Sequence, residues 1–89
     1  MKYESTMGVE LDVKPIGIKE REKFLAVKKV QEAFSDSPSW EERLEMHDHF
    51  LALCELCNIA GGAVGEGDIV PVISILLNGC LPSDFPTPR

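Results

Sequence analysis

The feature that most constrains this chain is an alternation of apolar and charged residues, Val9-Glu10-Leu11-Asp12-Val13-Lys14, which ends at Pro15. Alternation of this kind is typical of a half-buried β-strand, because successive side chains of a strand point to opposite faces. We expect the strand to end beside the proline, which has no backbone N–H for a sheet ladder. No other stretch has a comparable pattern. The strand therefore either leaves its edge for another chain or closes a small hairpin, with Gly8 at the turn or at a bulge.

The remainder of the sequence, as far as residue 80, is predicted to be helical. The first helix covers about residues 18–34, where Phe24, Val27, Val30 and Phe34 recur at spacings of three and four. This spacing is typical of an amphipathic helix with one apolar stripe.

A second helix follows the break at Ser35-Asp36-Ser37-Pro38 and ends near residues 58–60. Two starting registers are open. Ser37 is a good N-cap with Pro38 at the first helical position, whereas Ser39 forms a capping box with Glu42.

The third helix is short and apolar on nearly every side. It covers about residues 69–78, with Asp68 as its cap and Gly79 as its stop. An all-round apolar helix must be buried, and a chain of 89 residues buries only a modest share of its surface. We therefore expect part of this helix to be covered by a partner.

These patterns predict a mainly α fold: a three-helix small domain with one short N-terminal β-strand or a small hairpin. We expect residues 1–80 to form a single helical domain and residues 81–89, with three prolines, to be an extended tail. The net charge of −6 argues against nucleic-acid binding, because phosphate backbones are held by surplus lysine and arginine. No signal peptide or membrane span is visible. Three cysteines, an odd number, fit a reducing compartment, so we expect a cytoplasmic protein that does not bind membranes.

The cluster of His47, His49, Cys54 and Cys57 raises the possibility of zinc binding or redox chemistry. On one straight helix, however, His49 is about 160° away from His47, so the four side chains do not surround a single ion. The Cys-x-x-Cys pair is near the C-terminal end of the predicted helix, where the dipole opposes thiolate formation. We expect neither metal nor cofactor. No catalytic arrangement is apparent, because the glycine-rich residues 60–67 lack the Gly-Lys-Ser/Thr ending of a P-loop. The chain is predicted not to be an enzyme.

One short segment resembles a known family. The strand ending in Val13-Lys14-Pro15-Ile16, followed by Ile18-Lys19-Glu20-Arg21-Glu22-Lys23-Phe24 at a helix start, is similar to the beginning of the small tail assembly chaperones of long-tailed bacteriophages. The resemblance covers about sixteen of the 89 residues. It implies a non-enzymatic cytoplasmic assembly protein that covers a tail component and self-associates. It identifies no functional residue.

The leading hypothesis is a non-enzymatic protein-interaction module, either a homo-oligomer or an assembly chaperone or adaptor for one protein partner. Contacts are expected by strand addition and by helix packing, through Val9, Leu11, Val13, Ile69, Ile73 and Leu76. An alternative is an acidic regulatory binder, such as an antitoxin, an anti-factor or an inhibitor of a nucleic-acid-binding protein. The second helix motivates this alternative, because residues 38–60 carry a net charge of −4. A zinc or redox protein that uses the His/Cys cluster is the third hypothesis.

Overall fold

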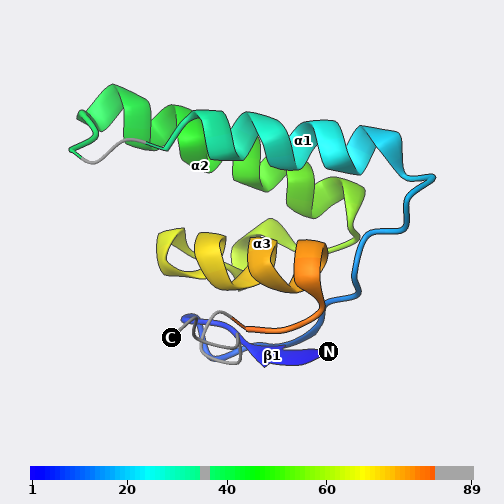
Figure 1. The fold of residues 1–89 in the computed structure, drawn as a ribbon. Coiled ribbons are helices and arrows are strands. Elements are labelled where there is room, and N and C mark those ends of the chain that lie inside the picture. The colour runs from blue at the N-terminus through cyan, green and yellow to red at the C-terminus, as the bar shows by residue number, and fades with distance from the viewer. Residues whose placement is uncertain (35–36, 82–89) are drawn as a thin grey trace, which may run out of the picture. The chain divides into compact units, whose positions relative to one another are not determined.

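The structure is a computed structural model that describes residues 1–34 and 37–81. It confirms a mainly α fold with three helices and a small N-terminal β-hairpin (Figure 1). The elements, with two single 3₁₀ turns η1 and η2, are β1 (Lys2–Glu4), β2 (Glu10–Asp12), α1 (Arg21–Glu32), α2 (Trp40–Leu56), η1 (Gly61–Ala63), η2 (Glu66–Asp68) and α3 (Ile69–Asn78). The predicted tail, apart from Leu81, is outside the described residues.

The chain divides into two compact units. One comprises Met1–Ile16 and Gly62–Arg89, and the other comprises Gly17–Gly61. We call the first the strand–α3 unit and the second the α1/α2 hairpin, and describe each by itself.

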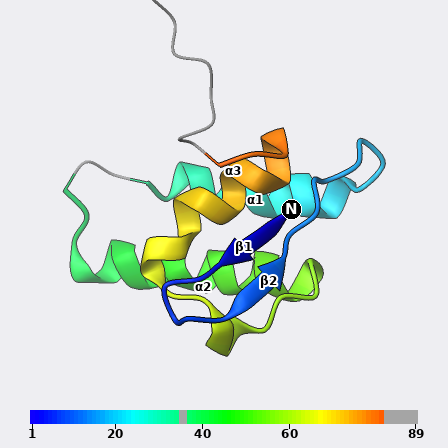
Figure 2. The ribbon, with the colours of Figure 1, turned by 90° about the horizontal axis from the view of Figure 1, so that it is seen from below.

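In the strand–α3 unit, β1 and β2 pair in antiparallel fashion, with Tyr3 opposite Leu11 (Figure 2). The turn between them is closed by a 2.8 Å hydrogen bond from Ser5 N to Val9 O, and Gly8 has a positive φ of 76°. The alternating segment thus pairs within the chain, and of the two alternatives the hairpin is confirmed. The strand Lys2–Glu4 is not predictable from its sequence pattern, because it is only three residues long and mostly polar.

Helix α3 is the apolar centre of the same unit. Val72, Ile75 and Leu76 are at most 2% exposed, and Ile16 N donates a 2.8 Å hydrogen bond to Leu76 O. The helix ends at Gly79, whose φ of 73° is in the left-handed region that favours glycine. The chain therefore buries most of this helix itself, contrary to expectation, and of its apolar side chains only Val70 and Leu77 are exposed.

A buried carboxylate ties the β-hairpin to the chain before α3. Asp68 is fully buried and accepts hydrogen bonds from the Tyr3 hydroxyl, the Thr6 backbone N–H and hydroxyl, and the Gly65 backbone N–H. We call these four residues the Asp68 clasp. Asp68 does precede α3 as predicted, but its side chain makes no capping hydrogen bond to that helix.

In the α1/α2 hairpin, the two helices lie side by side and run in opposite directions (Figure 1). Helix α1 begins three residues later than predicted, because Gly17 and Glu20 form a turn in which the Glu20 carboxylate accepts a 2.6 Å hydrogen bond from Gly17 N. Helix α2 begins after Ser39, whose side chain and that of Glu42 form the capping box. The capping-box register is thus confirmed over the one beginning at Ser37.

Candidate protein-binding site

The three strand residues proposed to bind a partner differ in their exposure to solvent. Val9 is 41% exposed, Leu11 is half-buried and Val13 is 1% exposed. Val13 also exchanges backbone hydrogen bonds with Met1, so its backbone is already paired within the chain. Of the three, Val9 is the one whose side chain is open to solvent.

The three proposed contact residues of α3 belong to the core. Ile69, Ile73 and Leu76 are 1%, 7% and 2% exposed. In this conformation a partner has almost no surface of these side chains to contact. More of the exposed large apolar side chains belong to the α1/α2 hairpin than to the strand–α3 unit.

The His/Cys cluster is dispersed over α2 and its end. Within residues 1–34 and 37–81, no group of three or more His, Cys, Asp or Glu side chains is arranged to hold a metal ion. Cys54 is buried and Cys57 is half-buried. Burial raises the pKa of the Cys57 thiol above its ordinary value of 9.0, although the nearby Lys23 ammonium opposes that change. A raised pKa disfavours the thiolate that redox chemistry requires.

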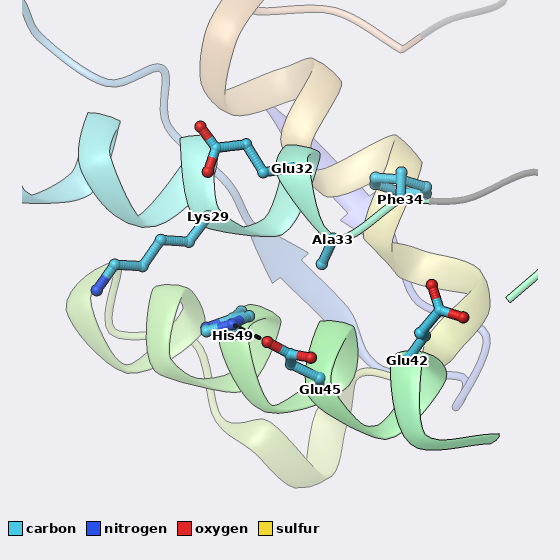
Figure 3. Close-up of a pocket in the computed structure, with 7 residues that line it drawn as sticks. All are labelled: Lys29, Glu32, Ala33, Phe34, Glu42, Glu45 and His49. Atoms are coloured by element: carbon cyan, nitrogen blue, oxygen red, sulfur yellow. Dashed lines mark ion pairs between the residues drawn. The ribbon is translucent and has the colours of Figure 1, made fainter. Parts of the chain in front are cut away.

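A groove runs along one face of the α1/α2 hairpin. Its acidic half has a volume of about 280 Å³ and lies between the end of α1 and the first half of α2 (Figure 3). The residues that line it are Lys29, Glu32, Ala33, Phe34, Glu42, Glu45 and His49. Figure 3 shows Glu45 and His49 on α2 opposite Ala33, with the His49 Nε2 3.6 Å from a Glu45 carboxylate oxygen.

The groove continues toward the other end of the hairpin, where its lining becomes apolar. This half has a volume of about 300 Å³ and shares Lys29 and His49 with the first. Its remaining lining residues are Glu22, Leu25, Ala26, Ala52 and Leu56. Leu25 is 49% exposed and Leu56 is 39% exposed, so both present apolar surface to the groove. The groove thus has an apolar end and an acidic end.

The chemistry of the groove suits recognition. Its lining holds four carboxylates and one lysine but no serine, threonine or cysteine among the described residues that form it. The described residues of this lining therefore offer no hydroxyl or thiol nucleophile. One of the carboxylates, Glu32, also lies 3.8 Å from the Lys28 ammonium on the solvent side of α1.

A second exposed surface lies on α2, on a different side of that helix from the groove. Trp40 is 74% exposed and Leu44, one turn later, is 61% exposed. The Arg43 guanidinium lies 4.8 Å from the centroid of the Trp40 ring, which is a cation–π arrangement. We call Trp40 and Leu44 the Trp40–Leu44 patch.

Comparisons of the chain with protein-family models, curated proteins and solved structures found no match. No helix of the described part of the chain is long and apolar enough to cross a membrane. Neither Trp40 nor Leu44 was predicted from the sequence as a contact residue. Their exposure depends on which faces of α2 the fold covers, and the groove depends on how two helices face each other. Neither the exposure of this patch nor the groove can therefore be predicted from the sequence of a single helix.

Proposed function

We propose that this chain is a non-enzymatic protein-interaction module of the cytoplasm, which self-associates and covers a protein partner as an adaptor or assembly chaperone does. The observation that carries the proposal is the Trp40–Leu44 patch, an aromatic and a branched apolar side chain one helical turn apart and mostly in water. Isolated exposed apolar residues are ordinary, but tryptophan and arginine are enriched among the residues that anchor interfaces, and here Arg43 stacks on an exposed Trp40 that has Leu44 one turn away.

The energetics favour covering this patch. Full burial of a leucine side chain contributes about 1.5–3 kcal/mol, and tryptophan has a still larger apolar area to bury. Because both residues lie on a regular helix with a capped N-terminus, little ordering is needed before a partner docks.

The resemblance of the alternating strand and the helix start that follows it, about sixteen residues in all, to the beginning of phage tail assembly chaperones supports the choice of an assembly protein within this class. The groove also supports a binding role, because its lining combines exposed apolar side chains with carboxylates.

Self-association is tested by sedimentation of the wild-type chain over a range of concentrations, compared with Leu44→Lys. The chain has one tryptophan, so the emission of Trp40 reports directly on burial of the patch. We expect the wild-type mass to rise with concentration while Trp40 emission shifts to shorter wavelength, and Leu44→Lys to abolish both changes. The matched control is Gln31→Lys, which adds the same charge at an exposed position of α1.

The partner-covering role is tested in the protein's own cells with a photo-crosslinking amino acid at position 44 or position 31. A discrete adduct at position 44 that is absent at position 31 and lost on Trp40→Ala is the expected result. A chain that remains monomeric to high concentration and forms no adduct at position 44 would contradict the proposal.

A second candidate function, an acidic regulatory binder, is favoured by one specific observation. Glu41, Asp48 and Glu55 are exposed and spaced by seven residues, so they form an acidic line along one side of α2. Such a line suits the basic surface of a nucleic-acid-binding protein. In that case, double-stranded DNA added to a lysate before irradiation would suppress cross-linking to the partner, whereas a partner held by the Trp40–Leu44 patch would still be cross-linked.

A further inference from the structure

We propose that the groove of the α1/α2 hairpin binds an amphipathic helix of a partner protein, with apolar residues along one half of that helix and lysine or arginine at one end. This inference rests on the proposed function and specifies the chemistry of one partner, but it uses residues separate from the Trp40–Leu44 patch. In this arrangement the partner helix packs against both α1 and α2 as a third helix.

The dimensions of the groove fit a helix. Its lining on α2 extends from Glu42 to Leu56, which at about 1.5 Å per residue is about 21 Å, the length of a helix of about 14 residues. Ala26, Ala33 and Ala52 line it with small side chains. Small residues leave room for the ridge of an incoming helix between α1 and α2.

The two ends of the groove differ in chemistry, and this difference orients the occupant. At the apolar end, Leu25 and Leu56 offer surface to leucine or methionine side chains. At the other end, Glu42 and Glu45 on α2 offer carboxylates one turn apart. A partner helix with lysine or arginine at this end and apolar residues at the other is complementary to both ends of the groove.

The negative charge of the chain also favours a different protein, rather than a second copy of this chain, as the occupant of the groove. Each copy carries a net charge of −6, so a second copy approaching an acidic groove is repelled. A basic helix is attracted to the same carboxylates. The occupant is therefore a basic, amphipathic helix of another protein.

The test uses two labelled synthetic helical peptides of about 16 residues, a length that covers the groove. Both carry leucines at helical spacing in one half. The other half of the first peptide carries two arginines, and in the matched peptide these are replaced by glutamates. Fluorescence anisotropy with the full chain is expected to show that the arginine peptide binds at least about tenfold more tightly, since each exposed charge pair contributes modestly and two are reversed.

Variants of the chain then locate the binding site. Ala52→Arg fills the apolar half of the groove and is expected to abolish binding of the arginine peptide, whereas Gln31→Arg adds the same charge outside the groove and is expected to preserve it. Glu45→Gln is expected to weaken binding several-fold, whereas Glu55→Gln, an exposed glutamate of α2 that does not line the groove, is expected to leave it unchanged. Circular dichroism of each variant verifies that helix content is retained.

Three outcomes would overturn the inference: equal binding of the two peptides, binding that survives Ala52→Arg, or no binding of either peptide. A dimer of the chain that Ala52→Arg dissociates and Gln31→Arg does not would also overturn it, because the occupant would then be a second copy. Failure here is distinguishable from failure of the proposed function, because the Leu44-dependent association and the adduct at position 44 do not involve the groove and would persist.

Discussion

Asp68 is the residue on which the strand–α3 unit most depends, because it holds a carboxylate with no exposure to solvent. Burial by itself would raise the pKa of this carboxyl. The hydrogen bonds from Tyr3, Gly65 and Thr6 outweigh burial and hold the pKa below its ordinary value of 3.8. The clasp therefore favours the charged carboxylate, and it connects β1 and the turn after it to the chain that precedes α3.

The clasp predicts an unusual titration of Tyr3. Burial, followed by the hydrogen bond to Asp68 and the negative charge of Asp68, raises the pKa of Tyr3 from 10.0 to about 12. The chain has one tyrosine, so the near-ultraviolet absorbance of phenolate follows this residue alone. We expect a midpoint near 12 in the wild type and one closer to 10.0 in Asp68→Asn. A wild-type midpoint at 10.0 would show that the Tyr3–Asp68 hydrogen bond does not form in solution.

The same two groups predict how stability depends on pH. The pKa of Asp68 is lowered in the fold, so its contribution to the free energy of unfolding is complete above 3.8 and is lost as pH falls through and below that value. The pKa of Tyr3 is raised, so its contribution is complete below pH 10.0 and is lost between 10.0 and about 12. Urea unfolding of the wild type and Tyr3→Phe across this range measures the effect. Their difference in stability should shrink as pH rises from 10.0 to 12.

Loss of the clasp is expected to cost much of the stability of a small domain. Asp68→Asn removes the charge and places an amide N–H₂ among groups that are themselves donors. We expect a loss of about 1–3 kcal/mol, the usual cost of leaving buried polar groups unsatisfied. Asp48→Asn, at an exposed position of α2, is the matched control and should change the free energy of unfolding by less than about 0.5 kcal/mol. Equal effects of the two changes would contradict the role given to the clasp.

At the scale of elements, the start of α2 provides a direct test of capping. The Ser39 hydroxyl accepts a hydrogen bond from Glu42 N, and the Glu42 carboxylate accepts one from Ser39 N. Ser39→Ala is expected to lower the free energy of unfolding by about 0.5–2 kcal/mol in urea denaturation. Ser37→Ala, at the alternative start, should have little effect. The reverse order of effects would favour a helix that begins two residues earlier.

The helices were predictable because their signals are local. Apolar spacing of three and four, the Ser39–Glu42 capping box and the stop at Gly79 each depend on residues within one or two turns. The pairing of β2 was harder to predict, because the alternation in its partner Lys2–Glu4 covers only three residues. Asp68 was assigned as an ordinary helix cap, since the donors from Tyr3 and Thr6 are more than sixty residues away in the sequence.

The candidate binding surfaces were the least predictable part. An apolar α3 suggested a surface for a partner, but the chain buries Ile69, Ile73 and Leu76 itself. The groove arises only when α1 and α2 face each other, as Ala26 of α1 and Ala52 of α2 do in its apolar half. Alanine is common on helices, so its presence in one helix does not predict a groove. The groove exists only once two helices lie side by side. Tertiary arrangement, rather than the pattern of one helix, therefore decides which apolar side chains stay exposed.

At the scale of the whole molecule, the excess of negative charge separates the two kinds of association. The net charge is −6, so two copies repel each other, whereas a basic helix is attracted. Salt screens both interactions, because the distance over which charges act falls from about 10 Å at 0.1 M salt to about 3 Å at 1 M. Added salt should therefore have opposite effects on the two equilibria.

This opposition gives a prediction that needs no mutation. Between about 0.05 M and about 0.5 M sodium chloride, self-association through the Trp40–Leu44 patch should strengthen, because the repulsion between copies is screened and burial of apolar surface is retained. Over the same range, the arginine peptide should dissociate from the groove. Sedimentation measures the first equilibrium and anisotropy the second, on one preparation of protein. If salt weakens both, charge attraction also holds the copies together, and the acidic line of α2 rather than the Trp40–Leu44 patch would be the contact to examine.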